Sequence, residues 1–194
     1  MQMGVQEYLN ENLEPEWSGP LRPEILTFTG IPLPMHGVAP RVVLGDAWWN
    51  AERKKAYAST DHHCIACGVS KYEAQAREWL EGHEVYKINY NKGRMVFKET
   101  VALCHYCHAY CHPGRLNHLL ESGLINHAKY ANIIQHGDAI LESAGLERIN
   151  NTEILAPWEK WRLVIGRKKY KPKYKSYDEY LAANIQEEIE LESS

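Results

Sequence analysis

The chain has 194 residues and a formal net charge of −3, and 44% of its residues are hydrophobic. This apolar fraction allows a buried core and excludes disorder throughout, while a mean hydropathy of −0.50 excludes a membrane bundle. The N-terminus has no basic segment followed by an apolar run, and no apolar stretch approaches the ~20 residues that span a bilayer. We therefore expect a soluble, intracellular protein with one domain and extensions, and no membrane partner.

Proline dominates the first part of the chain. Residues 1–45 contain six prolines, so we expect an irregular N-terminal arm there. Asp46 can cap a helix that extends to Tyr57, in which Trp49 and Arg53 recur at helical spacing. This helix leads into the first pair of cysteines.

A hairpin followed by a helix is predicted for the middle of the chain. A helix is expected over Tyr72–Glu81, followed by strands over Gly82–Tyr90 and Arg94–Leu103. The intervening Asn91-Lys92-Gly93 is a short turn with glycine available for positive φ. A helix is then expected to start over His105–His112, until Pro113-Gly114 interrupts it.

Helices and one strand are predicted next. Apolar residues recur at helical spacing from Arg115 to Gly145, which is a stop signal, and we expect packing helices there. Trp158–Ile165 is expected to form a strand.

Charge is strongly segregated near the C-terminus. Residues 167–175, which we call the basic strip, carry six Lys or Arg and no acid, whereas residues 176–194 carry six acids and no base. Ser176 and Glu179 have the spacing of a capping box, which predicts a final helix through Leu191. The near-neutral total therefore hides a locally basic surface that can meet nucleic acid.

Four of the five cysteines form two Cys-x-x-Cys pairs, Cys64 with Cys67 and Cys104 with Cys107. Each such turn delivers two thiolates, and two turns complete a tetrahedral zinc site. Four ordinary buried cysteines are the alternative, but chance does not produce this spacing twice. We therefore expect structural zinc, with Cys111 left over as a buried thiol.

A second group of metal ligands is predicted from histidines. His108 and His112 are four residues apart, so a helix places both imidazoles on one face, where they can share a metal. The third ligand has to come from elsewhere, and His83-Glu84 on the first predicted strand is the candidate. The alternative is that the two helix histidines only form hydrogen bonds at the surface.

The order of these motifs resembles that of the HNH endonucleases. The resemblance rests on Cys-x-x-Cys, His83-Glu84-Val85 on a strand, a second strand, and Leu-Cys-His-Tyr-Cys-His-Ala-Tyr-Cys-His over residues 103–112, and it covers roughly residues 60–115. It implies an α+β fold with a zinc-stapled ββα-metal core, a treble-clef variant with flanking helices. It also implies metal-dependent hydrolysis of phosphodiester bonds in DNA, with magnesium, manganese or another divalent ion as the catalytic metal.

The resemblance also implies roles for single residues. Ungapped alignment makes His83 a ligand of the catalytic metal together with His108 and His112, and makes Glu84 the general base. Shifting the register by one makes His83 the base and leaves Gly82 in the ligand place. The asparagine that the family usually has about five residues before the third cysteine is Glu99 here.

Candidate contacts with DNA phosphates lie outside the ligand motifs. Arg115 follows the helix histidines, and four further cations belong to the basic strip: Arg167, Lys168, Lys169 and Lys171. The alternative for the strip is a solvated strand neutralised by the acidic helix that follows it. The flanks around residues 40–49 and 158–163 resemble bacterial and phage proteins with this type of core, which implies the cytoplasm of a bacterial host.

We therefore expect an HNH-type endonuclease. A rival prediction is a catalytically degenerate zinc-binding module that binds nucleic acid or a host protein, and it is motivated by Glu84 and by the missing asparagine. The chain is divided accordingly into an irregular arm, an HNH-like zinc-binding core, a helical packing region, and the basic strip with the acidic helix: residues 1–45, 46–115, 116–166 and 167–194.

Overall fold

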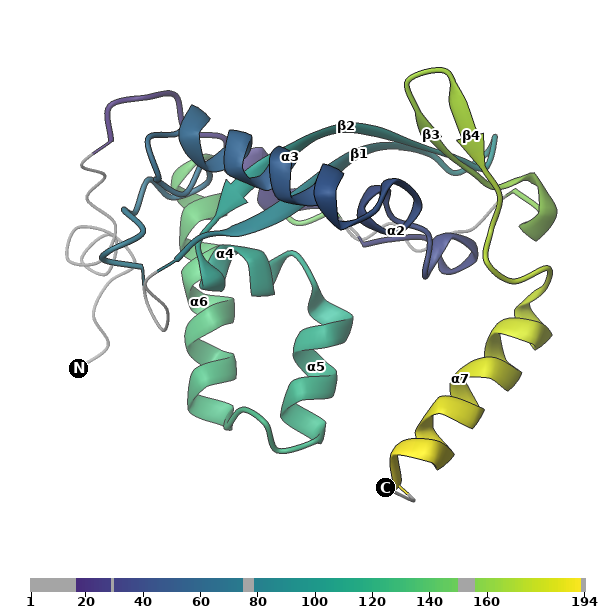
Figure 1. The fold of residues 1–194 in the computed structure, drawn as a ribbon. Helices are drawn as coiled ribbons and strands as arrows, with labels where there is room; N and C mark the ends of the chain where they lie inside the picture. Colours follow the sequence, from purple (N-terminus) through teal and green to yellow (C-terminus); the bar gives the residue numbers. More distant parts are fainter. Residues whose placement is uncertain (1–16, 29, 75–78, 150–155, 193–194) are drawn as a thin grey trace. The chain divides into compact units, whose positions relative to one another are not determined.

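The computed structural model describes residues 17–28, 30–74, 79–149 and 156–192. It has a mixed α+β fold with a four-stranded sheet in the order β1-β2-β3-β4 (Figure 1). The chain forms two compact units, each made of three segments: unit 1 is residues 1–30, 50–85 and 100–151, and unit 2 is residues 31–49, 86–99 and 152–194. Each unit draws on several of the four parts expected from the sequence, because β1 and β2 contribute residues to both.

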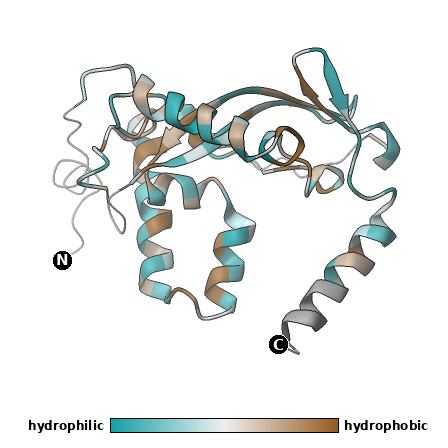
Figure 2. Ribbon diagram, in the orientation of Figure 1, coloured by the Kyte–Doolittle hydropathy of each residue, from teal (hydrophilic) through white to brown (hydrophobic). Residues whose placement is uncertain are grey.

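Unit 1 holds the residues of both predicted metal sites. Its elements are η1 (Pro23–Thr27), most of α3 (Asp46–Ser59), parts of β1 (Glu81–Asn89) and β2 (Arg94–Leu103), α4 (His105–Tyr110), α5 (Pro113–Glu121) and α6 (His127–Ser143). Its hydrophobic core surrounds the cysteines with residues such as Leu103, Tyr110 and Ile140. Hydrophobic and hydrophilic residues follow each other around α5 and α6, as in amphipathic helices (Figure 2).

Helix α4 packs tightly against α6. A Cβ atom at Gly137 would lie 2.2–2.4 Å from ring atoms of Tyr110, so only glycine permits this approach. The Tyr110 hydroxyl donates to Asp138 Oδ1 at 2.6 Å, and the Arg148 guanidinium donates to the Tyr110 carbonyl at 2.6 Å and stacks on its ring. These contacts fix the helix that contains Cys107 and has Cys104 as its N-cap.

Several boundaries differ from the sequence prediction in unit 1. The expected helix over Tyr72–Glu81 is absent from its described residues, because Glu81 pairs in β1, and residues 75–78 lie outside the described part. Helix α6 continues through Gly137, which lies directly against the ring of Tyr110. Pro113 ends the preceding helix as predicted and begins α5.

Unit 2 contains the other strands and the C-terminal helix. Its own elements are η2 (Leu33–Met35), α2 (Pro40–Leu44), η3 (Trp158–Lys160), β3 (Arg162–Ile165), β4 (Lys168–Tyr170) and α7 (Tyr177–Glu192). Strand β3 pairs parallel with β2 and antiparallel with β4 around a core that includes Met95, Trp161 and Leu163. Gly93 has φ +60°, and a Cβ there would lie 3.1 Å from the Trp161 nitrogen, so the turn requires glycine.

The predictions for unit 2 hold with one correction. The strand expected from Trp158 begins only at Arg162, because a 3₁₀ turn follows Pro157. The N-cap half of the predicted capping box is confirmed, since the Glu179 amide donates to Ser176 Oγ at 3.2 Å. Glu179 Oε2 accepts from the amide of the preceding residue, Lys175, at 2.8 Å instead of from that of Ser176.

The described part of the arm, residues 17–28 and 30–45, contains only short helical segments, and residues 1–16 and 29 lie outside the described part. Among the helices of the described residues, none combines the length and apolarity needed to cross a membrane.

Candidate metal centres

The four paired cysteines meet in one buried group in unit 1. Their sulfur atoms lie within 4.8 Å of one another, and the residues are 0–4% exposed. Cys67 Sγ and Cys104 Sγ are 3.8 Å apart, and sulfurs bound ~2.3 Å from one tetrahedral zinc ion lie about that far from each other. The prediction that the pairs converge is confirmed, and the group can hold a structural metal such as zinc.

The local backbone explains why each pair presents both sulfurs. Gly68 follows the first pair with φ +80°, and its amide donates to the Cys64 carbonyl at 2.8 Å, which closes the turn. The second pair begins α4, where Cys104 is the N-cap and its sulfur accepts from the Cys107 amide at 3.4 Å. Both turns are local, which is why spacing alone predicted them.

The electrostatics of the cysteine group favour a bound cation. Burial raises the pKa of the Cys107 thiol, and the hydrogen bond with Cys104 raises that of Cys67. The hydrogen bond with Cys107, followed by those with Cys64 and Cys67, lowers the pKa of Cys104. The sulfurs are thus close enough to compete for protons, and a divalent ion that replaces those protons allows all four to bind as thiolates.

The three predicted histidines form a second group in unit 1. The ring nitrogens that His83, His108 and His112 offer lie within 4.8 Å of one another, and their ring centroids are 4.7–5.5 Å apart. His83 comes from β1 and is 3% exposed, whereas the other two come from α4 and the start of α5. Three converging imidazoles are a donor set that suits a divalent cation.

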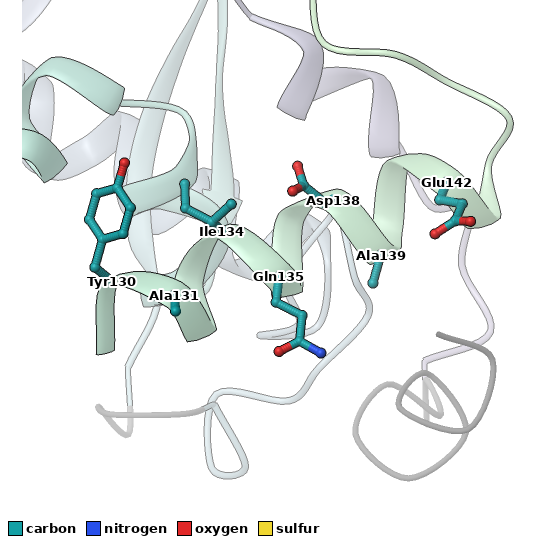
Figure 3. A pocket seen from close by; sticks show the side chains of 7 residues that line it. All are labelled: Tyr130, Ala131, Ile134, Gln135, Asp138, Ala139 and Glu142. Atoms are coloured by element: carbon teal, nitrogen blue, oxygen red, sulfur yellow. The ribbon is translucent and has the colours of Figure 1, made fainter. Parts of the chain in front are cut away.

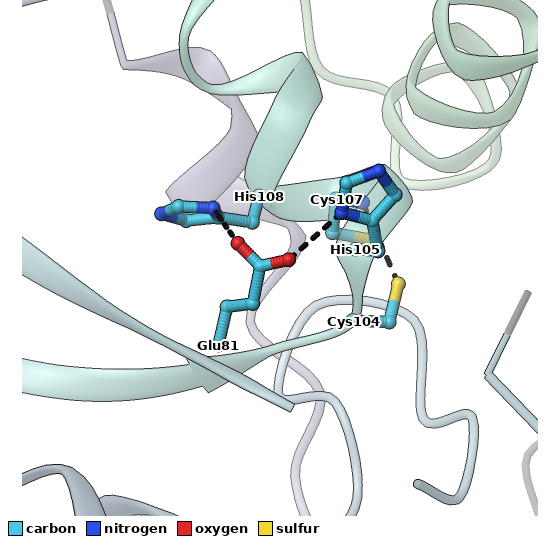
Figure 4. Close-up of polar contacts among 5 residues, drawn as sticks. All are labelled: Glu81, Cys104, His105, Cys107 and His108. Carbon is cyan, nitrogen blue, oxygen red and sulfur yellow. Dashed lines mark hydrogen bonds and ion pairs between the residues drawn. The ribbon is translucent and has the colours of Figure 1, made fainter. Parts of the chain in front are cut away.

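A carboxylate that the sequence did not predict supports this histidine group. Glu81 Oε2 is 2.5 Å from His108 Nδ1, and Glu81 Oε1 is 2.8 Å from His105 Nδ1 (Figure 4). Burial opposes ionisation of Glu81, but the hydrogen bonds from the two histidines prevail and hold its pKa well below the ordinary value. Because Nδ1 of His108 is occupied, its Nε2 is left for a metal.

The signal for Glu81 was present in the strand pattern. Successive side chains of a strand point to opposite faces, so Glu81 shares the face of His83. The helix predicted over residues 72–81 concealed this relation. The same alternation directs Glu84 to the face opposite His83, and Glu84 is not a member of the histidine group.

Arg115 is exposed and lines one small hollow together with His108 and His112, among apolar residues such as Leu116 and Ile133. It lies at the edge of the histidine group, where a phosphate contact was predicted. The other candidate cations belong to unit 2 and are all exposed in or next to the β3–β4 hairpin: Arg167, Lys168, Lys169 and Lys171.

A second hollow runs along α6 in unit 1 (Figure 3). It is lined by residues of that one helix between Tyr130 and Glu142, including Ile134 and Gln135. It contains none of the predicted site residues.

Comparison of the chain with family models, with curated proteins and with solved structures gives no match.

Substituting Glu81 by Gln is expected to weaken Mn²⁺ binding at the histidine group about 10- to 100-fold. A carboxylate that accepts a hydrogen bond from a ligating histidine orients the ring and raises its basicity. Isothermal titration of zinc-loaded protein measures this affinity. Glu121→Gln, at the exposed end of α5, is the matched control and should bind Mn²⁺ like the wild type. Equal affinities for the two variants would contradict the orienting role of Glu81.

The remaining cysteine is expected to be chemically inert in the folded protein. Cys111 is 0% exposed, and burial raises its pKa to about 12, so only ~10⁻⁴ of it is thiolate at pH 8. Iodoacetamide treatment followed by mass spectrometry should find Cys111 modified only after denaturation. Modification of Cys111 in the native protein would contradict this expectation.

Proposed function

We propose that this chain is a metal-dependent HNH-type endonuclease that hydrolyses phosphodiester bonds in DNA. The observation that carries it is the convergence of His83, His108 and His112 in the same compact unit as the four-cysteine group. This pairing of a buried thiol group with a separate histidine group is the pattern that the sequence resemblance implies.

Five residues have distinct roles in the proposed reaction. His83, His108 and His112 hold the catalytic ion, since His83 faces the other two rings and therefore fits a ligand better than a base. Glu81 orients His108, and Arg115 supplies positive charge for a phosphate at the edge of the group. A divalent cation in such a site supplies Lewis-acid activation of a phosphate oxygen and of a water molecule.

The basic strip provides a further surface for the substrate backbone. Six cations within residues 167–175, including Arg167 and Lys169, can contact successive phosphates without reading sequence. Binding through this strip should weaken steeply with salt.

Cleavage of supercoiled plasmid tests the proposed activity. Zinc-loaded protein supplied with Mg²⁺ or Mn²⁺ should produce nicked or linear DNA, and EDTA should stop the reaction. The absence of cleavage with Mg²⁺, Mn²⁺, Co²⁺ and Ni²⁺ would contradict it.

A second candidate is a zinc-stabilised module that binds nucleic acid or a host protein without catalysis. It is favoured by Glu99, which is exposed on β2 where the family usually has asparagine, and by Glu84, which is outside the histidine group. Gel-shift binding of DNA without cleavage, together with no measurable Mn²⁺ affinity at the histidines, distinguishes this function from a nuclease.

A further inference from the structure

A buried histidine that neither predicted site includes lies against the cysteine group. His136, in the middle of α6, is 2% exposed. Its Nε2 is 3.3 Å from Cys107 Sγ and 4.0 Å from Cys104 Sγ, yet it is not one of the four mutually close ligands. It therefore lies next to the metal site as a neighbour of its ligands.

The surroundings of the ring indicate which nitrogen carries the proton. Nδ1 of His136 is buried and has no hydrogen-bond partner among the described residues, whereas Nε2 faces sulfur. A protonated Nδ1 would leave a buried donor unsatisfied and would direct the Nε2 lone pair at a thiolate. The ring also meets Tyr106 edge to face, with centroids 5.6 Å apart, which holds its orientation. This geometry favours an Nε2–H that points at the sulfur of Cys107.

A donor at this position has a clear electrostatic effect. Four thiolates around one Zn²⁺ carry a net charge of −2, and these four cysteines are buried. Buried charge is costly unless hydrogen bonds share it. Among the residues that the structure describes, one backbone amide donates to a sulfur of the group, that of Cys107 to Cys104. An Nε2–H donor shares the negative charge of the Cys107 sulfur, which makes that sulfur less basic, so that protonation displaces it from the metal less readily.

We propose that His136 is a positioning residue of the zinc centre, whose Nε2–H donates a hydrogen bond to the Cys107 thiolate and slows metal release. This role extends the centre from the two cysteine turns to α6. It does not depend on the proposed nuclease activity.

Two variants separate the hydrogen bond from packing. His136→Leu has nearly the same volume but no donor, whereas His136→Gln can place an amide N–H near the Nε2 position. In Co²⁺-substituted protein, the sulfur-to-cobalt charge-transfer bands should move to longer wavelength in the leucine variant and remain near the wild-type position in the glutamine variant. Zinc transfer to a chelating dye should be about tenfold faster or more in the leucine variant only.

Ile140→Val is the control for lost packing on α6. Ile140 is buried in the same core as the cysteines, and its side chain has no group that can donate a hydrogen bond to sulfur. It should leave the cobalt bands and zinc transfer unchanged. Equal shifts in the leucine and glutamine variants, or no shift in either, would overturn the role. A wild-type cobalt spectrum of three sulfurs and one nitrogen would also overturn it, because His136 would then be a ligand.

A measurement on the wild-type protein keeps the test independent of how the variants fold. Long-range ¹H–¹⁵N spectra of the zinc form report which imidazole nitrogen is protonated. A protonated Nε2 on His136 is the expected result, and a protonated Nδ1 would overturn the role.

Discussion

Removal of zinc from the cysteine group is expected to unfold unit 1. The four sulfurs lie inside its hydrophobic core, so loss of the ion leaves buried thiols in place of four metal bonds. Structural zinc contributes about 10–16 kcal/mol in small metal-dependent folds, which matches or exceeds the roughly 5–15 kcal/mol that stabilises a whole domain. Titration with a strong chelator, followed by far-UV circular dichroism and zinc analysis, should show one zinc per chain and loss of helix as it leaves.

Two cysteine variants provide the matched comparison for the effect of zinc. Cys107→Ser removes a ligand, so the purified variant should contain much less than one zinc per chain and should show no cooperative unfolding transition of unit 1. Cys111→Ala changes an equally buried thiol outside the ligand group and should keep one zinc, with a much smaller decrease in Tm. Full zinc content and an unchanged Tm in Cys107→Ser would show that the four-cysteine group is not the structural centre.

Local spacing was the main signal from which the convergence of the four cysteines and of the three histidines was predicted. A Cys-x-x-Cys turn and a pair of histidines four residues apart are set by the geometry of a tight turn and of one helix. The position of His83 beside the other two histidines followed from the expectation that a hairpin packs beside the helix. Most residues of the candidate site could therefore be predicted from the sequence, because they lie in or next to a tight turn, one strand and one helix.

The contacts of the supporting residues were not predicted, because they form between segments that are distant in the sequence. His136 is 29 residues from Cys107 and reaches it only because Gly137 allows α6 to approach α4. Glu81 lies 24 residues before His105 and contacts it only because β1 extends back to that residue. The contact of His136 leaves no periodic signal in the chain, whereas the alternation that places Glu81 on the face of His83 was concealed by the helix predicted over residues 72–81.

The role predicted for Glu84 illustrates a related limit. Motif alignment treats His83 and Glu84 as neighbours, but in a regular strand adjacent side chains leave opposite faces. The two-unit organisation was missed for another reason, since the parallel pairing of Arg94 with Arg162 joins segments far apart in sequence. Patterns within a short window carry no information on such pairings.

Alanine at His83 or His108 is expected to abolish DNA cleavage while zinc at the cysteines is retained. Each change removes one of the three ligands proposed for a catalytic ion, and such an ion contributes several kcal/mol to stabilisation of the transition state. Since each ~1.4 kcal/mol added to the activation free energy slows a reaction tenfold, cleavage should be slower by at least about 10²-fold. Plasmid cleavage under Mn²⁺ and a Mn²⁺ binding titration, each with the zinc content verified, measure both effects.

Matched variants decide whether the effect belongs to the histidine group. His118→Ala removes an exposed imidazole from α5 and should cleave like the wild type. His112→Ala should also lose activity. Because His112 is half-buried, this variant should lose less packing than His83→Ala, which changes a buried residue. Glu84→Gln should retain most activity, because its side chain is on the other face of β1. If Glu84→Gln were inactive while His83→Ala still cleaved, the metal group proposed for catalysis would be wrong.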